Sequence, residues 1–261
     1  MSKLGLVLGA GGARGIAHLG VLGALEENNI KVDVITGCSM GAVIGGLYAL
    51  GYTVEELKQL IPTIKKKNII DISLNPISNK ALLKGEKIDK LLKGLFQDKL
   101  IEDCKIPFGC VSSDIIKGEE VFFDKGSLFT AVRASVSIPT IIKPLEYDGK
   151  LLIDGGIINR VPVLHAKEMG ADKIIAIDAL GEPTKDAKVK NLIDLALRCI
   201  DFVDYYITND KLNKVSPDLL LEPQLGNMSQ YKVEKLDFAY EQGYKITMEN
   251  MDKIKALVKD E

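Results

Sequence analysis

Residue types that most often bind metals or act as catalytic bases are scarce in this chain. It has two histidines and four cysteines among 261 residues. The cysteines form no CxxC pair, so the sequence predicts no zinc site. Cysteines scattered without a disulfide framework are typical of proteins of the reducing cytosol. We therefore expect a cytoplasmic protein without a structural metal.

An excess of positive charge is also missing. The 34 basic and 36 acidic residues give a net charge of −2. Nucleic-acid-binding proteins usually show a strong basic excess, so we expect no nucleic-acid partner. With 46% hydrophobic and 27% charged residues, the composition is that of an ordinary globular protein. No repeat, linker or low-complexity segment divides the sequence, and residues 1–261 are predicted to form one domain.

The sequence predicts neither a secretory leader nor a membrane-spanning helix. Residues 1–12 contain one lysine and a short apolar run, and no small-residue cleavage site follows, so we expect a first strand there. The uncharged window from Val34 to Val54 is long enough to cross a bilayer. It contains five glycines, two threonines and a serine, however, which fits a buried strand followed by a buried helix better.

The N-terminal part alternates between the two kinds of secondary structure. Apolar runs at 4–10 and 31–37 predict strands, and each is followed by a predicted helix, at 13–28 and 39–51. Thr53 and Glu56 then form a capping box that begins a further helix. A β-α-β-α order builds a parallel sheet covered by helices, which places the chain in the α/β class.

The rest of the chain is predicted to continue this pattern. The expected elements are a mostly helical stretch at 68–100, two strands joined at Lys117–Gly118, a short helix ended by Pro139, a hairpin turning at Asp148–Gly149, a helix at 161–171, a strand at 172–180, and a charged helical tail from 185 to 261 with one strand near 219–223.

Three short glycine-containing stretches could carry chemistry. The first, Gly9 to Gly15 (GAGGARG), lies between the first predicted strand and helix. It could be a tight turn or a dinucleotide-binding fingerprint, but Arg14 stands where that fingerprint needs its third glycine. A third interpretation is an anion cradle, in which outward-pointing N–H groups at a helix N-terminus stabilise an oxyanion.

The second stretch is GCSMG, with Ser39 between Gly37 and Gly41 at the predicted junction of a strand and a helix. It could be an ordinary glycine-rich turn. It could also be a nucleophile elbow, where small flanking residues are needed because the strand and the helix approach each other closely.

The third stretch is Asp154 followed by Gly155 and Gly156, at the end of the apolar strand LLID. A serine nucleophile needs a base, and Asp154 and His165 are both candidates. The order Ser39, Asp154, His165 matches that of a Ser-Asp-His hydrolase. His165 is predicted to lie within a helix, however, whereas a triad histidine usually lies on a loop. His18, about one turn into the first helix, is expected to have a packing or hydrogen-bonding role.

Taken together, the ordered stretches GAGGARG, GCSMG and DGG resemble the patatin-like phospholipase family, in particular its small single-domain bacterial members. RASVSIP and DGGIINRVPVLHAKEMGAD extend the resemblance, which covers residues 3–180; the tail is not distinctive. Many family members have three consecutive glycines in the first stretch, where this chain has Ala10-Gly11-Gly12. Alanine keeps its N–H, so this difference leaves the donors in place.

The resemblance implies a three-layer α/β sandwich with a mainly parallel central sheet. It also implies a catalytic dyad in which Ser39 is the nucleophile and Asp154 the base, with no catalytic histidine, metal or cofactor. The backbone N–H groups of Gly11, Gly12 and Arg14 would form the oxyanion hole.

The implied activity is hydrolysis of lipid acyl esters, of the phospholipase A or lysophospholipase type, through an acyl-enzyme intermediate. The substrate implies peripheral contact with the inner face of a membrane. We expect the segment 65–100 and the tail to set the shape of the pocket. Two alternatives remain at this stage: a catalytically weak regulator or scaffold, and a dinucleotide-binding α/β protein.

Overall fold

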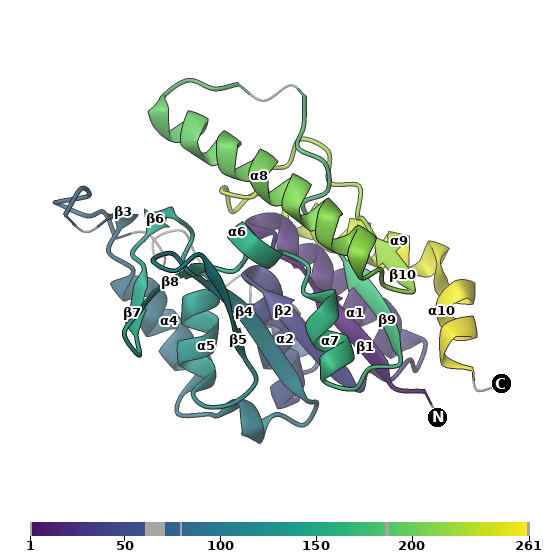
Figure 1. The fold of residues 1–261 in the computed structure, drawn as a ribbon. Helices are drawn as coiled ribbons and strands as arrows, with labels where there is room; N and C mark the ends of the chain where they lie inside the picture. The colour runs from purple at the N-terminus through teal and green to yellow at the C-terminus, as the bar shows by residue number, and fades with distance from the viewer. Residues whose placement is uncertain (1, 61–70, 79, 186–187, 260–261) are drawn as a thin grey trace.

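The computed structural model describes residues 2–60, 71–78, 80–185 and 188–259 (Figure 1). Within these residues, eight strands form one sheet. Its spatial order is β10 (Leu219–Leu221), β9 (Lys173–Ile177), β1 (Leu4–Leu8), β2 (Val34–Cys38), β4 (Phe108–Asp114), β8 (Lys150–Asp154) and β7 (Leu145–Tyr147), while β5 (Glu119–Phe123) pairs with β4.

The central part of the sheet is parallel and its far end is antiparallel. Parallel pairing joins β10 to β9, β9 to β1, β1 to β2 and β2 to β4. Strands β5 and β8 each pair antiparallel with β4, and β7 pairs antiparallel with β8. The mainly parallel sheet predicted from the sequence is thus confirmed.

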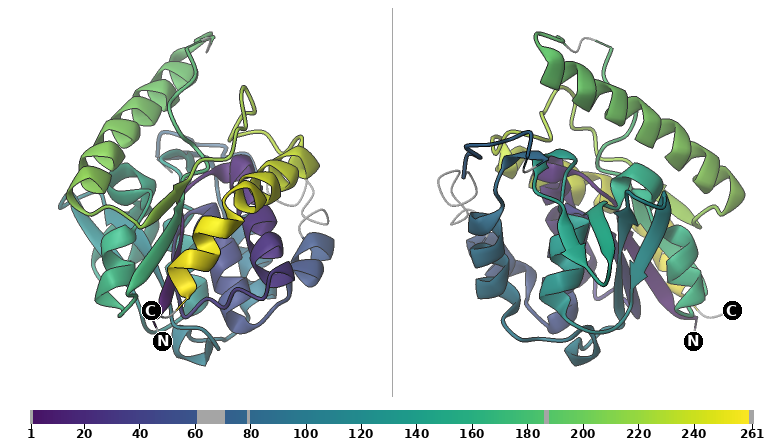
Figure 2. Two further views of the ribbon diagram at one scale, coloured as in Figure 1. Left: turned by 90° about the vertical axis from the view of Figure 1, so that its right-hand side faces the viewer. Right: turned by 60° about the vertical axis from the view of Figure 1, so that its left-hand side comes forward.

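Helices cover both faces of the sheet (Figure 2). On β1, Leu4, Leu6 and Leu8 contribute to the larger core cluster and Val7 to the smaller one, because successive strand residues point to opposite faces. The larger core includes residues of α1 (Ala17–Glu27), α2 (Met40–Leu50), α3 (Val54–Leu60), α4 (Glu86–Phe96), α5 (Leu128–Ser135), α9 (Leu236–Glu249) and α10 (Met251–Val258). The smaller core includes α7 (Val163–Glu168). This is the predicted three-layer arrangement.

Several local predictions are confirmed. Glu56 accepts a hydrogen bond from the Thr53 N–H at 2.8 Å and donates its own N–H to the Thr53 hydroxyl, which completes the capping box of α3. Asp148 and Gly149 both have positive φ, as the two-residue turn between β7 and β8 requires. The uncharged window forms β2 and α2, which ends at Gly51 with φ of 103°.

The prediction of a mostly helical stretch at 68–100 is wrong for much of its described part. Only α4 is a helix there; residues 71–78 and 80–85 form turns and β3 (Ala81–Leu83). The Asp71 carboxylate accepts hydrogen bonds from the N–H groups of Gly85 and Lys87, which closes this stretch into a loop before the helix. Strand β3 pairs with β6 (Thr140–Ile142). Residues 61–70, which include the start of the stretch predicted at 68–100, lie outside the described residues.

The tail packs onto the rest of the chain. Strand β10, predicted near 219–223, adds in parallel to β9. Helix α9 lies against α1 at a close approach between glycines: a Cβ at Gly20 would lie 2.0 Å from the Tyr240 carbonyl oxygen, and one at Gly243 would lie 1.9 Å from that of Ala17. The two backbones therefore meet at distances that leave no room for a side chain.

We predict that Gly243→Ala lowers the free energy of unfolding by more than about 1–3 kcal/mol, because the new methyl group overpacks the contact with α1. The matched control is Gly94→Ala, in α4, where a Cβ would meet nothing within 4 Å. Alanine should stabilise that helix by about 0.5–1 kcal/mol. Urea unfolding of both variants measures the contrast, and equal changes would contradict the packing argument.

Candidate active site

The sheet brings the ends of β2 and β8 together on one edge of β4. Strand β5 pairs with the same β4 residues that pair with β2 or β8, so β5 must lie on a different edge of β4 from both of them. Strands β2 and β8 therefore share one edge of β4. On that edge Cys38 lies opposite Val111, and Asp154 lies opposite the next residue, Ser112. Ser39 and Asp154, which are far apart in the sequence, therefore become neighbours.

Ser39 lies on a sharp turn between β2 and α2. Its φ and ψ are 53° and −120°, an unusual conformation for a residue other than glycine. The flanking glycines are required by space. A Cβ at Gly41 would lie 2.0 Å from the Leu8 carbonyl oxygen, and one at Gly37 would lie 2.8 Å from the Ala42 N atom. These are the features of a nucleophile elbow, in which the strand and the helix approach too closely for side chains.

The Ser39 hydroxyl donates a hydrogen bond of 2.6 Å to Oδ2 of Asp154. The other carboxylate oxygen, Oδ1, accepts the N–H of Gly156 at 2.8 Å and faces the Cys38 thiol at 3.7 Å. Gly155 lets β8 end close to β4, because a Cβ there would lie 2.5 Å from the Val111 carbonyl oxygen. Both carboxylate oxygens are thus held, and one faces the serine.

The dyad is nearly removed from solvent, with Ser39 5% and Asp154 7% exposed. Burial penalises the ionised carboxylate and raises the pKa of Asp154 to about 6, although the hydrogen bonds from Ser39, Gly156 and Cys38 act in the opposite direction. A carboxylate with this pKa accepts a proton more readily than an exposed aspartate does.

Neither histidine hydrogen-bonds to Ser39 or Asp154. His18 is buried and its Nε2 lies 2.8 Å from the Gly9 carbonyl oxygen, which is the hydrogen-bonding role expected from the sequence. His165 lies on α7, where its ring nitrogens contact the carboxylates of Glu120 and Glu168. The Ser-Asp-His alternative therefore has no geometric support.

The glycine loop lies beside the dyad and leads into a 3-10 helix, η1 (Gly12–Ile16). In the described part of the chain, the N–H groups of Gly11 and Gly12 have no hydrogen-bond acceptor. The Arg14 N–H, by contrast, donates to the Gly11 carbonyl at 2.9 Å. The expectation that Arg14 supplies an oxyanion donor is therefore revised, because its amide is already used within the turn.

The sequence matches the patatin-like phospholipase family over residues 6–167. The chain belongs to this family. It is 38% identical over 189 residues to an uncharacterized NTE family protein of Mycobacterium tuberculosis, covering 71% of this chain and 52% of that relative. It is 38% identical over 181 residues to lysophospholipase nte1 of Emericella nidulans, covering 67% of this chain and 12% of that protein. The chain thus spans about half the length of the mycobacterial relative.

The fold is also similar to that of a known structure. The crystal structure of VipD from Legionella pneumophila superposes with a TM-score of 0.59 at 16% identity, covering 97% of this chain and 67% of that chain. In the described parts of this patatin-like chain, no helix is long and apolar enough to cross a membrane. No group of three or more potential metal ligands was found among the same residues.

The dyad of this patatin-like chain faces a small cavity of about 40 Å³, which has room for about one or two water molecules. Its floor is formed by the glycine loop, Ser39 and Asp154. Its cover comes from the tail: Ile200, Asp201 and Asp204 of α8 (Leu192–Lys214), together with Gln230 and Tyr231. The expectation that the tail shapes the pocket is confirmed, whereas no described residue of the segment 65–100 lines this cavity.

Buried ion pairs hold α8 above the site. Arg160, which follows α6 (Gly156–Asn159), donates to Asp178 at 2.6 Å and also to Asp204 of α8. All three side chains are buried, and burial raises the pKa of Asp204 to about 7. Gln230 and Tyr231 hydrogen-bond to Asp201, which lies one helical turn before Asp204 on α8. Sequence reasoning missed these contacts because each joins residues that are 18 or more positions apart in the chain.

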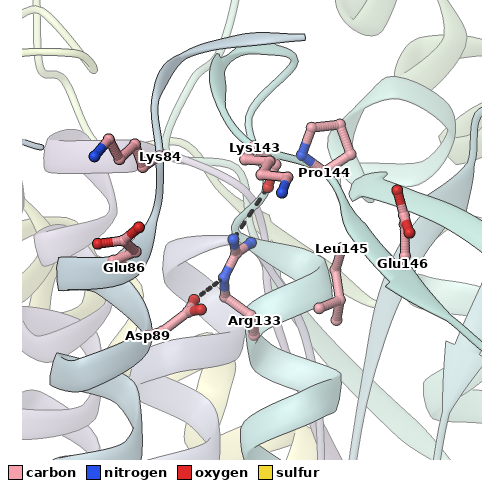
Figure 3. A pocket seen from close by; sticks show the side chains of 8 residues that line it. All are labelled: Lys84, Glu86, Asp89, Arg133, Lys143, Pro144, Leu145 and Glu146. Carbon is pink, nitrogen blue, oxygen red and sulfur yellow. Dashed lines mark hydrogen bonds and ion pairs between the residues drawn. The ribbon is translucent and has the colours of Figure 1, made fainter. Parts of the chain in front are cut away.

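A second, open pocket of about 400 Å³ lies away from the dyad (Figure 3). Its charged lining residues are Lys84, Glu86, Asp89, Arg133, Lys143 and Glu146. Arg133 is buried and donates to the Asp89 carboxylate, to the Ser137 hydroxyl and to the Lys143 carbonyl. These bonds join α4 to the chain on both sides of β6. Ile138 and Pro139, which precede β6, line the small cavity beside Ser39 and Asp154. We assign this pocket a structural role.

Ser135 is a further residue that sequence reasoning did not single out, although it lies within the motif RASVSIP. It is the last residue of α5 and is fully buried. Its hydroxyl oxygen accepts the N–H of Ser39 at 2.8 Å. Helix α5 thereby fixes the strained turn that carries Ser39.

We predict that Ser135→Ala destabilises the protein by about 1–3 kcal/mol in urea unfolding, because the buried Ser39 N–H loses its acceptor. Ser113 offers a matched control. Its hydroxyl is buried and, among the described residues, has no hydrogen-bond partner, so Ser113→Ala should be neutral or slightly stabilising. Equal losses in the two variants would show that the Ser135 hydrogen bond contributes little.

Proposed function

We propose that this chain is a serine hydrolase of lipid acyl esters that works through a Ser39–Asp154 dyad. The observation that carries the proposal is the 2.6 Å hydrogen bond from the nucleophile-elbow serine to a buried carboxylate whose pKa is raised. Membership of the patatin-like phospholipase family supports the same conclusion, as does the similarity to a protein named lysophospholipase.

In the proposed mechanism, Asp154 accepts the proton of Ser39 while the serine oxygen attacks the ester carbonyl carbon. The N–H groups of Gly11 and Gly12, which line the cavity, stabilise the oxyanion that forms. The intermediate collapses with loss of the alcohol, which takes the proton from Asp154, and leaves an acyl group on Ser39. Water, deprotonated by Asp154, then attacks the carbonyl carbon of this ester. The bond to the Ser39 oxygen breaks, Ser39 regains its proton from Asp154, and the fatty acid is released.

A lipid ester fits the character of the site. The apolar lining residues of the cavity are Ala10, Ile138, Pro139, Ile157, Leu180 and Ile200. Such a wall favours an acyl chain over a charged substrate. We propose a phospholipase A or lysophospholipase type of activity, with peripheral contact between the protein and its lipid substrate.

The structure gives less support to the two alternatives. A regulator or scaffold needs no organised dyad, yet both oxygens of Asp154 and the hydroxyl of Ser39 are engaged. A dinucleotide would have to approach the glycine loop closely, but the Gln230 carbonyl occupies that space. It accepts the Ala13 N–H at 2.9 Å and lies 2.3 Å from the position of a Cβ on Gly12.

Hydrolysis of a p-nitrophenyl acyl ester tests the dyad. We expect Ser39→Ala and Asp154→Asn to lose activity by several orders of magnitude, because one removes the nucleophile and the other the base. His165→Ala should stay within a few-fold of the unchanged protein. Circular dichroism would check that each variant is folded. An inactive but folded His165→Ala would favour the Ser-Asp-His mechanism instead.

The pH dependence provides a separate test. Asp154 must be ionised to accept a proton, and its pKa is raised to about 6. We therefore expect kcat/KM to fall about tenfold per unit as the pH drops below about 6. The same profile should appear in His165→Ala. A midpoint near 4, the value of an unperturbed aspartate, would show that burial does not tune this base.

A further inference from the structure

Helix α8 has two opposite faces of very different character. At 100° per residue, Leu197, Asp204 and Thr208 share one side of the helix, and all three are buried. Ile200 and Asp201, on the same side, line the catalytic cavity. This inner face therefore covers the candidate active site.

The outer face carries an exposed apolar stripe, which we call the outer stripe: Leu192, Leu195, Cys199, Phe202 and Tyr206. These residues follow one another at intervals of 3, 4, 3 and 4, which places them along the side opposite the buried residues. Leu192 is 80% exposed and Tyr206 is 67% exposed. In the views of Figures 1 and 2, the N-terminal half of α8 projects beyond the body of the molecule.

A second exposed apolar segment lies in the loop before β3. Its residues Ile72, Leu74 and Ile77 are 73%, 86% and 93% exposed. That loop is joined to the cavity wall, because β3 pairs with β6 directly after Ile138 and Pro139. In Figure 1, the β3 loop and the N-terminal end of α8 lie on the same side of the molecule. Exposed apolar residues thus lie on two elements that are connected to the cavity wall.

Positive charge adjoins the outer stripe. Lys185, Lys188 and Lys190 precede α8 and are exposed, and none has an ion-pair partner in the described part of the chain. A helix that lies in a membrane interface combines an apolar stripe with lysines that reach the head groups. The arrangement is therefore complementary to a lipid surface that carries negative charge.

We propose that the outer stripe of α8, with the three lysines and the loop at 71–78, docks this protein onto an anionic lipid surface. This inference rests on the proposed function, since the lipid substrate is what the site must reach. Docking through α8 brings the cavity to the lipid, because the inner face of the same helix lines that cavity. The stripe spans about two heptads, fewer than the three or four of a stable coiled coil, which favours a lipid surface over a second copy.

The chain contains no tryptophan, so a single introduced tryptophan reports on one position. Phe202→Trp places it in the outer stripe. Leu100→Trp is the control, at an exposed leucine beyond the C-terminal end of α4. Both are made in full-length Ser39→Ala protein, so that the vesicles are not hydrolysed. With vesicles of phosphatidylcholine and phosphatidylserine, we expect a blue shift of emission for Phe202→Trp and none for Leu100→Trp.

Charge-introducing variants measure how much the stripe contributes. Leu195→Asp should weaken binding to these vesicles about tenfold, the effect of exposing one leucine. Leu100→Asp should not, although the two leucines are similarly exposed, at 49% and 43%. Ile77→Asp should also weaken binding. Lys188→Glu combined with Lys190→Glu should remove most of the preference for phosphatidylserine over pure phosphatidylcholine vesicles.

Equal vesicle binding by Leu195→Asp and Leu100→Asp would overturn the proposal. So would a dimer that forms without lipid and that Leu195→Asp converts to a monomer, because the stripe would then bind a second copy. The binding assay does not depend on catalysis. If the unsubstituted protein hydrolyses lipid esters but does not bind these vesicles, that result counts against the docking surface alone. If the unsubstituted protein binds the vesicles but has no hydrolase activity, that result counts against the proposed function alone.

Discussion

The hydrogen bond between Ser39 and Asp154 depends on where two strands end. Strands β2 and β8 share one edge of β4, and their last residues lie opposite Val111 and Ser112. This register brings the hydroxyl within 2.6 Å of the carboxylate without any histidine between them. The same constraint explains the glycines around the site. At the ends of both strands, other backbone atoms lie within about 2–3 Å of the place where a Cβ on Gly37, Gly41 or Gly155 would be. A shift of one residue in either pairing would move the side chain to the other face of the sheet.

Under the proposed mechanism, burial is what would make an aspartate adequate as the base. An exposed carboxylate titrates near 4 and is a weak base at neutral pH. Here desolvation raises the pKa of Asp154 to about 6, and that desolvation requires a cover over the cavity. The cover is the tail, held by the buried contacts of Arg160 with Asp178 and Asp204. The segment with the least distinctive sequence therefore completes the electrostatics of the site.

The sequence predicts local features of this protein well and long-range contacts poorly. The strands around the three glycine stretches could be predicted because each has its own periodicity and turn residues. The loop at 71–78 could not, because it depends on Asp71 accepting N–H groups 14 and 16 residues away. The role of Ser135 depends on a contact with Ser39, 96 residues distant. Arg14 was assigned as a donor from its position in a motif, but the local 3-10 turn uses its amide.

The same helix that shields the dyad from water also presents its exposed apolar side outward. Exposed leucine and aromatic side chains in a regular stripe are unfavourable in water unless something covers them. If the protein hydrolyses lipids as proposed, the lipid surface itself would cover the outer stripe. The ion pairs that hold α8 would then also set the angle at which the outer stripe meets the lipid surface. A cavity of about 40 Å³ is far smaller than an acyl chain needs. Under the proposed function, substrate entry would therefore require α8, Gln230 or Tyr231 to move. Contact between the lipid and the outer face of α8 would act on the element that has to move.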